Sequence, residues 1–407
     1  MKKIMVIAGG SYQVPLIQKI KSLGHYVINS NLYEDSPGFK YSDETYVANV
    51  LDIEKNLEIA RRVRPDAILT DQSDISVPTV CKLCEELGLP TIGQSMGELF
   101  TNKFAMRNFC KEHGFLYPEY KLCKTKEEAI DFYKLVNNKM IIKPTDSQAS
   151  RGVFTINCLE DLEKYFELSL NCSTKNKTVI LEEFIEGTEF TVDGFKFPTG
   201  HLTLAISEKE HYEHNKNVAS KLTFSYYNKN FDYDLLRKTN DSIINASGLP
   251  FGLTHVEYKY CNGQFYLIEM AARGGGGKIA SHIVPTISGI DNYDLLIKAS
   301  LGETLPHVKD INLEEKYKQY CAVLNFINPG KTGVFKFIAG DKEILLDKHV
   351  IDLTMNYKIG EEVFLPTDDS KRFGSYIAWG ENEFIFKNVV KNIENTMEIG
   401  IGDSSEK

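Results

Sequence analysis

The stretch THVEYKYCNGQFYLIEMAAR, residues 254–273, decides how the centre of this chain folds. Two runs rich in aromatic and aliphatic residues flank Asn262-Gly263, the strongest short-range signal for a β-hairpin. A two-residue turn would place Glu257 opposite Ile268 and would turn Glu269 to the other face of the sheet. A three-residue loop with a bulge at Gly263 would instead bring Glu257 and Glu269 to one face.

In the second arrangement His255, Ala271 and Arg273 lie on the same face as the two glutamates. Neighbouring carboxylates repel each other unless a cation lies between them. Mg²⁺ prefers oxygen ligands and is commonly held by one or two carboxylates together with substrate phosphates. The hairpin therefore predicts a Mg²⁺ site at Glu257 and Glu269. The alternative is that both are surface residues of an edge hairpin, although their apolar flanks argue against it.

The composition restricts the classes of protein to which the chain can belong. A length of 407 residues indicates two or three domains, and 42% hydrophobic with 25% charged residues is typical of a globular protein. The net charge of −9 and the lack of a basic stripe argue against nucleic acid as a partner. No segment approaches the ~20 apolar residues of a membrane span. The start, MKKIMVIAGG, is better interpreted as a strand than as a signal peptide, so we expect no membrane contact and a cytoplasmic location.

The eight cysteines are scattered along the chain and predict no metal centre. Cys81 and Cys84 form the only close pair, in a helical pattern that lacks the further ligands of a zinc site. We expect reduced, half-buried thiols.

Residues 1–95 alternate strand and helix patterns, which predicts an N-terminal parallel α/β sheet domain. A nicotinamide-binding unit is the obvious alternative. The first turn, AGGSYQV, lacks the third glycine of that fingerprint, and no acidic residue directly follows the second strand.

From residue 96 the pattern changes to α+β, and we place a second domain at 96–312. It opens with an expected helix over residues 96–114. Past residue 312 the strand patterns shorten and the glycines spread out, which predicts a β-rich domain at 313–407.

Three further segments contain residues suited to ligand binding, although each is also typical of ordinary secondary structure when taken alone. Lys143 ends an apolar strand and precedes a loop of small polar residues at 145–152, which can fold over a polyphosphate. The stretch LEEFIEGTE, residues 181–189, has the form of an interdomain hinge, with a simple connection between two strands as the alternative. Lys103 and Arg107 are four residues apart on a helix, where most such side chains are solvated.

In this order, the segments resemble the ATP-grasp superfamily, especially its carboxylate–amine (L-amino acid) ligases and biotin-carboxylase-like members. The resemblance covers most of the chain and implies an ATP-grasp fold for the central domain. It implies that ATP and Mg²⁺ are bound, with one or two ions and with Mn²⁺ able to substitute. The implied ATP and metal ligands are Lys103 and Lys143 on the phosphates, Ser147, Ser150 and Gly152 in the covering loop, Glu182 and the backbone of Glu183 and Ile185 at adenine, Glu189 on the ribose, and Glu257 and Glu269 on Mg²⁺.

One departure from the family pattern concerns the metal. The family usually shows E-x-N-x-R, whereas this chain has Ala271 between Glu269 and Arg273, and alanine cannot bind a metal ion. The second Mg²⁺ site therefore lacks one ligand.

The implied reaction is an ATP-dependent ligation. A small-molecule carboxylate attacks the γ-phosphate of ATP and displaces ADP, which gives an acyl phosphate. An amine then attacks the activated carbonyl and displaces phosphate, so that the products are an amide or peptide, ADP and phosphate. The predicted catalytic residues are Lys143 at the phosphates, Arg273 at the oxyanion, and His255 as an orienting group or base. We expect Gly274–Gly277 to let the backbone pass close to the acceptor substrate.

Three alternatives to the ligase remain open, namely a carboxylase that uses bicarbonate, an ATP-binding regulatory protein without turnover, and a nicotinamide oxidoreductase. The stretch 211–217 is either a lid or a mobile surface loop. A homodimer is expected.

Overall fold

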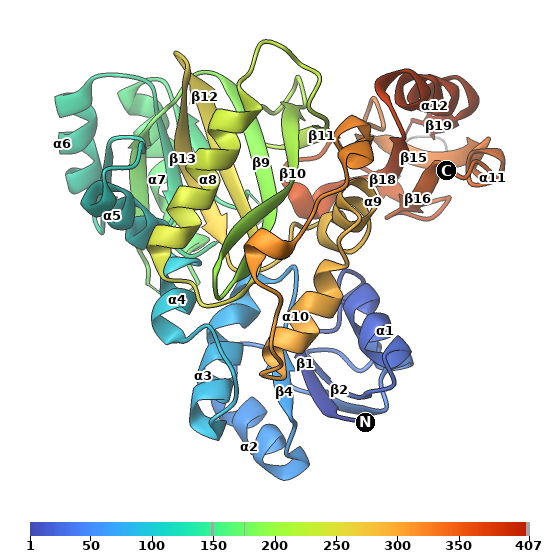
Figure 1. Cartoon of the computed structure of the whole chain (residues 1–407). Coiled ribbons are helices and arrows are strands. Elements are labelled where there is room, and N and C mark those ends of the chain that lie inside the picture. The colour runs from blue at the N-terminus through green and yellow to red at the C-terminus, as the bar shows by residue number, and fades with distance from the viewer. Residues whose placement is uncertain (148–149, 175, 404–407) are drawn as a thin grey trace.

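The N-terminal part folds as a parallel sheet flanked by helices, as the alternating pattern predicts. The computed structural model describes residues 1–147, 150–174 and 176–403. Figure 1 shows this sheet at one end of the molecule, with strand order β3-β2-β1-β4 and parallel pairing throughout. Its elements are β1 (Lys3–Ile7), α1 (Val14–Ser22), β2 (Tyr26–Asn31), β3 (Glu44–Val47), α2 (Ile53–Val63), β4 (Ala67–Leu69) and α3 (Val77–Leu87).

The single helix expected over residues 96–114 is wrong, because two helices form there, α4 (Gln94–Leu99) and α5 (Lys103–His113). Asn102 separates them, since its side-chain oxygen accepts hydrogen bonds from two backbone N–H groups at the start of α5, at 2.9 and 3.2 Å. Asparagine is among the residues preferred at this capping position. Lys103 consequently becomes the first residue of α5, and its N–H donates to the carbonyl of Thr145 at 3.0 Å.

A small antiparallel sheet follows, with strand order β5-β8-β6-β7 and two helices on it (Figure 1). Its elements are β5 (Tyr120–Cys123), α6 (Lys126–Val136), β6 (Met140–Pro144), β7 (Phe154–Ile156), α7 (Leu159–Asn171) and β8 (Val179–Glu183).

An eight-stranded antiparallel sheet forms the centre of the molecule, in the order β13-β12-β9-β10-β11-β14-β18-β16. Its strands are β9 (Thr188–Phe197), β10 (Gly200–His211), β11 (Ala219–Phe224), β12 (Gly252–Cys261), β13 (Gln264–Ala271), β14 (Cys321–Ile327), β16 (Val350–Met355) and β18 (Gly374–Gly380). Hydrogen bonds run from β11 to β14, so the large sheet continues into the C-terminal part of the chain. The boundary at residue 313 therefore remains a proposal.

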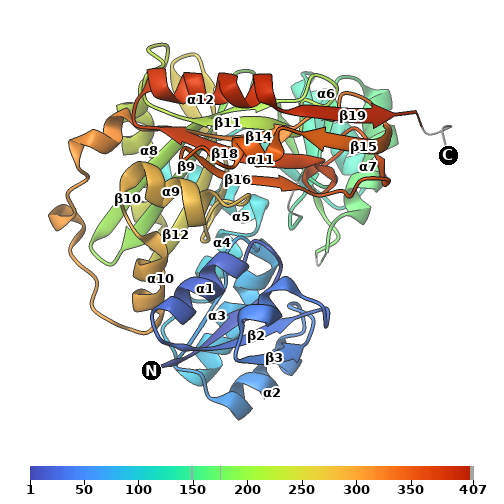
Figure 2. The same ribbon diagram turned by 90° about the vertical axis from the view of Figure 1, so that its right-hand side faces the viewer.

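The C-terminal part adds a second, three-stranded sheet with the order β17-β15-β19. Figure 2 shows α12 lying along these C-terminal strands, on the side of the molecule away from the N-terminal sheet. The remaining elements are α8 (Tyr233–Ser247), α9 (Val284–Ser288), α10 (Asn292–Ser300), β15 (Gly333–Ala339), α11 (Asp341–Ile344), β17 (Glu362–Val363), α12 (Glu383–Thr396) and β19 (Glu398–Gly402).

The two faces of the large sheet differ in chemistry, and this difference positions the site. Successive side chains of a strand point to opposite faces. On β9, Phe190 and Val192 pack in a buried cluster that includes Leu236 of α8. Glu189 and Asp193 therefore point to the opposite face, where polar groups gather.

Candidate active site

The β12–β13 hairpin places the two predicted metal ligands, Glu257 and Glu269, side by side. The bulge that brings them together lies at a different position from the expected one. Asn262-Gly263 forms a two-residue turn with positive φ at both positions, and Cys261 pairs with Gln264. The irregularity lies farther along, where Ile268 is an extra residue on β13. Glu257 consequently pairs with Glu269, and directly opposite side chains share one face. The bulge was expected at Gly263, whereas the structure has it at Ile268.

Two lysines contact these carboxylates. Lys103 Nζ lies 2.8 Å from Glu269 Oε1 and 2.9 Å from the carbonyl oxygen of Ser147. Lys209 Nζ lies 2.9 Å from Glu257 and 2.5 Å from Glu189. Burial raises the pKa of Glu257, but Lys209 and His255 lower it more strongly, so that the pKa lies well below its ordinary value. This carboxylate is therefore ionised.

Lys143 belongs to a buried ionic cluster next to this pair. Its Nζ lies 2.6 Å from Glu182 Oε2, and Arg107 Nε donates to the other oxygen of Glu182 at 2.7 Å. Burial and the neighbouring cations Arg107 and Lys103 lower the pKa of Lys143, although Glu182 opposes them. Burial raises the pKa of Glu182, but its two cationic partners lower it below the ordinary value. Solvation, the ordinary alternative for helical side chains of this kind, does not apply to Lys103 and Arg107, because only 4% and 0% of their surfaces are exposed.

His255 lies between the predicted metal-ligand pair and a buried aspartate. Its Nδ1 is 2.9 Å from Asp193 Oδ1, and its Nε2 is 3.8 Å from Glu257 Oε1. Burial lowers the pKa of His255, but Asp193 and Glu257 raise it to about 9. The imidazole is therefore protonated at neutral pH and adds positive charge beside Glu257.

Arg273 joins the hairpin to the N-terminal sheet domain. Its Nε and Nη2 donate to the two carboxylate oxygens of Asp74 at 2.9 and 2.8 Å. Burial raises the pKa of Asp74, but Arg273 lowers it below the ordinary value. Asp71, in the same segment, accepts a hydrogen bond from the N–H of Gly274 at 2.7 Å and one from Tyr293 at 2.5 Å.

Three of the four glycines after Arg273, namely Gly274, Gly275 and Gly277, pass close to protein groups, whereas a Cβ on Gly276 would meet nothing within 4 Å. A Cβ on Gly275 would lie 2.7 Å from Asp193 Oδ1 and 2.9 Å from His255 Nδ1. A Cβ on Gly274 would lie 2.8 Å from Asp71 Oδ1. This crowding explains glycine at these two positions without an acceptor substrate.

The loop after β6 is described on both sides of residues 148–149, which lie outside the described residues. The carbonyl of Ser147 accepts from Lys103, and Ser150 and Gly152 both have positive φ. A Cβ on Gly152 would lie 2.7 Å from the Cβ of Cys172, so glycine is required where the loop passes α7. The loop that is predicted to cover the phosphates therefore begins beside Lys103.

The hinge-like segment links the small sheet to the large one. The N–H of Glu183 donates to the carbonyl of Glu119 at 2.8 Å, and Ile185 is half-buried. A Cβ on Gly187 would overlap the carbonyl oxygen of Tyr260. Glu189, at the start of β9, contacts Lys209 and also lies 3.3 Å from both Lys259 and His211.

Several site residues were not found from the sequence. Asp193 continues the alternation begun by Glu189 in TEFTVDGF, and this period-two pattern would have revealed it. Lys209 and Asp74 carry no comparable signal, because they reach the site only through strand pairing and domain contact.

The stretch 211–217 docks on the C-terminal part of the chain. The Nε2 atom of His214 lies 3.0 Å from the carbonyl oxygen of Pro366, and Asn215 donates to the carbonyl of Thr367 at 3.1 Å. A lid function for this stretch remains a prediction.

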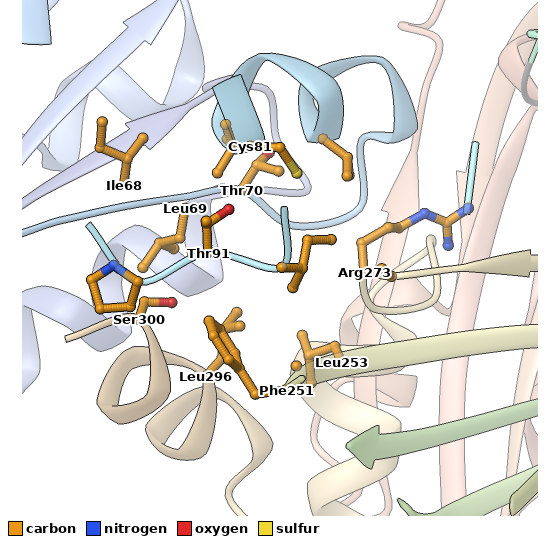
Figure 3. A pocket seen from close by; sticks show the side chains of 16 residues that line it. Ile68, Leu69, Thr70, Cys81, Thr91, Phe251, Leu253, Arg273, Leu296 and Ser300 are labelled. Atoms are coloured by element: carbon orange, nitrogen blue, oxygen red, sulfur yellow. The ribbon is translucent and has the colours of Figure 1, made fainter. Parts of the chain in front are cut away.

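A mostly apolar cavity of about 50 Å³ lies behind Arg273, between the N-terminal sheet domain and the large sheet. Figure 3 shows Leu69, Cys81, Leu253 and Leu296 around it, while the guanidinium of Arg273 points away from these residues. The space is too small for a nucleotide and belongs to the packing between the two parts.

Within residues 1–147, 150–174 and 176–403, no group of three or more His, Cys, Asp or Glu side chains is arranged to hold a metal ion. Cys81 and Cys84 are buried free thiols. Of the helices that the structure describes, none is long and apolar enough to cross a membrane.

Comparisons with known proteins identify a recognised fold in this chain. Residues 136–282 match the family described as ATP-grasp domain. The formate-dependent phosphoribosylglycinamide formyltransferase of Sulfolobus acidocaldarius is 24% identical over 318 residues, which cover 76% of this chain and 78% of that protein. The crystal structure of the L-amino acid ligase from Bacillus licheniformis superposes with a TM-score of 0.82 at 19% identity and 99% coverage of both chains.

A third similar protein is the biotin carboxylase domain of the 2-oxoglutarate carboxylase from Hydrogenobacter thermophilus, with a TM-score of 0.76 at 18% identity. The alignment covers 98% of this chain and 91% of that one, whose structure contains MgADP, ADP and bicarbonate. These similarities agree with the parallel N-terminal sheet and the large antiparallel sheet described above.

Proposed function

The chain carries an ATP-grasp domain, and we propose that it is an ATP-dependent ligase that activates a carboxylate as an acyl phosphate and joins it to an amine. The observation that carries this proposal is the pairing of Glu257 with Glu269 on a face that also receives Lys103. Lys143, held by Glu182, lies close enough to Lys103 for their charges to interact.

Mg²⁺ fits this pair of glutamates. Two carboxylates lie opposite each other, and lysines now neutralise both of them. Mg²⁺ usually takes one or two protein carboxylates and completes its shell with phosphates and water, so a larger protein cage is not needed. Ala271 supplies no third ligand, which favours one ion, and Mn²⁺ should substitute. Glu257 and Glu269 would hold the ion, and its positive charge would offset the negative charge of the ATP phosphates.

The nucleotide would lie between the small and the large sheet. In this proposal Lys103 and Lys143 bind the phosphates under the loop that contains Ser147, Ser150 and Gly152. Because Arg107 and Lys143 already engage both oxygens of Glu182, this carboxylate would orient Lys143 as well as face adenine. The backbone of Glu183 and Ile185 would complete the adenine contacts, and Glu189 would bind the ribose.

The carboxylate substrate would react next to the proposed metal ligands Glu257 and Glu269. Arg273, held in place by two hydrogen bonds to Asp74, would stabilise the oxyanion that forms when the amine attacks. Because His255 is protonated at neutral pH, it would orient the acid through charge rather than act as a base.

The names of the similar proteins support an acid and an amine as the substrates. One is a formate-dependent formyltransferase of phosphoribosylglycinamide, and another is an L-amino acid ligase. Formate and amino acids are both small carboxylates. Bicarbonate is the second candidate, since it is present in the similar biotin carboxylase domain.

The experiment measures ADP release from ATP by the full-length protein with Mg²⁺. Formate, the amino acids and bicarbonate are each tested as the acid, with and without an amine. We expect ADP release to require both an acid and an amine. Release with bicarbonate alone would favour a carboxylase, and ATP binding without turnover for any pair would favour a regulatory protein.

Two glutamate substitutions make the assay specific for the site. Glu269→Gln should abolish stimulated ADP release, because it removes one charged metal ligand. Glu210→Gln is the matched control, since Glu210 also pairs with a lysine on the large sheet, Lys221 at 2.7 Å, but has an exposed side chain. Equal loss in both variants would contradict the assigned site.

A homodimer and a cytoplasmic location remain predictions. Light scattering on the purified chain gives the mass in solution and tests the first of them directly, since a monomer would contradict it.

A further inference from the structure

Arg107 is buried between the two parts of the nucleotide site and contacts both. It lies on α5 four residues after Lys103, so the two side chains lie on one face of the helix. None of its surface is exposed. Its Nε donates to Glu182 Oε1 at 2.7 Å, and its Nη2 donates to the carbonyl oxygen of Ile268 at 2.6 Å.

The carbonyl of Ile268 belongs to the extra residue of the β13 bulge. A bulge leaves backbone groups without their usual partner across the ladder. The contact is part-buried, so a carbonyl left here without a partner would be poorly hydrated, and the guanidinium is a strong donor to it. Arg107 thus stabilises the irregularity that pairs Glu257 with Glu269. Without the bulge, regular pairing from the two-residue turn would set Glu257 opposite Ile268.

The other contact of Arg107 reaches the phosphate side of the site. Glu182 holds Lys143 at 2.6 Å, so the guanidinium, the carboxylate and the ammonium form one buried row. The remaining nitrogen, Nη1, is buried and has no hydrogen-bond partner among the residues that the structure describes. The guanidinium is held by its hydrogen bonds to Glu182 and Ile268.

We propose that Arg107 is a positioning residue that fixes the metal-binding register of the hairpin and, through Glu182, the position of the phosphate-binding Lys143. The inference rests on the proposed function, because it assigns Mg²⁺ to the hairpin and ATP phosphates to Lys143. A lysine at position 107 cannot replace the guanidinium, since one ammonium lacks the planar fork that spans both acceptors.

The test measures Mn²⁺ affinity at saturating ADP by electron paramagnetic resonance, using the full chain. R107M should weaken Mn²⁺ binding by about 10- to 100-fold, as is typical when a residue that orients a metal ligand is lost. R107K should also weaken it. R61M is the matched control, because Arg61 is an exposed helical arginine that pairs with Glu86, and its Mn²⁺ affinity should equal that of the wild type.

Deletion of Ile268 separates the register effect from a general loss of structure. The deletion removes the bulge and leaves Glu257 opposite Glu269 by regular pairing. In this background R107M should weaken Mn²⁺ binding much less than it does in the wild type, because the register of the hairpin no longer depends on Arg107 and the two changes are not additive. ADP affinity without metal should still fall with R107M, because the Lys143 contact is separate from the bulge.

The outcomes distinguish the two proposals. A wild type that binds no Mn²⁺ with ADP overturns the proposed function. A wild type that binds Mn²⁺, together with R107M that binds it equally well, overturns the role of Arg107. An equal loss with and without Ile268 also overturns that role. Thermal unfolding identifies variants that do not fold. If R107M does not fold, R107K is compared instead, both in the wild type and in the Ile268 deletion.

Discussion

Replacement of Asp193 by asparagine should remove most of the pH dependence that His255 gives to the stability of the metal-free protein. Asp193 lies 2.9 Å from His255 Nδ1, and it is the strongest influence that raises the pKa of this imidazole. The pKa rises from an ordinary value of 6.5 to about 9. Since one pKa unit is about 1.4 kcal/mol, the protonated imidazole stabilises the folded state by about 3 kcal/mol.

The sign follows from linkage. A group whose pKa is raised on folding contributes its full stability below its unfolded pKa, and the contribution is lost as the pH rises through the folded pKa. The contribution of His255 is therefore complete below about pH 6.5 and disappears between about pH 6.5 and 9. D193N should be less stable than the wild type at about pH 6 and close to it at about pH 9.5, where the wild-type contribution has already been lost.

The assay is urea denaturation without metal or nucleotide at both pH values, together with an NMR titration of the His255 imidazole. D241N is the matched control, because Asp241 lies 2.6 Å from His201 on the same sheet but burial lowers the pKa of His201. D241N should therefore show no stability change specific to this pH window. A His255 imidazole that titrates near 6.5 in the wild type would contradict the stabilising role of Asp193, as would equal pH dependence in D193N.

Asp74→Asn should lower the free energy of unfolding at neutral pH by about 3 kcal/mol, because the buried guanidinium of Arg273 loses its charged partner. The deficit, measured by urea denaturation, should shrink below about pH 4, because the pKa of Asp74 is lowered on folding and its contribution is lost as the carboxylate protonates. Gly187→Ala should destabilise the protein by about 2 kcal/mol or more, since its Cβ would overlap the Tyr260 carbonyl at a positive φ. Gly248→Ala, at a positive φ but with no neighbour within 4 Å, should cost about 1 kcal/mol, and equal losses would contradict the steric argument.

The fold and much of the site were accessible from the sequence, because local patterns determine them. Alternating apolar runs predicted the parallel N-terminal sheet, and Asn262-Gly263 predicted the hairpin. The pairing of Glu257 with Glu269 was predicted as one of two registers. Asn102 carried a capping signal for α5 that would have divided the expected single helix.

The remaining features depend on contacts between distant segments. A bulge residue is invisible in a periodic pattern, because Ile268 looks like any other apolar strand residue. The burial of Arg107 requires Glu182 and Ile268, which are 75 and 161 residues away along the chain. Similarly, the contact between Asp74 and Arg273 joins positions 199 residues apart.

A crystal structure of the full chain with ADP and Mg²⁺ would test the metal assignment. We expect an ion about 2.1 Å from carboxylate oxygens of both Glu257 and Glu269, with Lys103 and Lys143 on the phosphates. An ion bound by only one of these glutamates, or phosphates bound away from the two lysines, would contradict it.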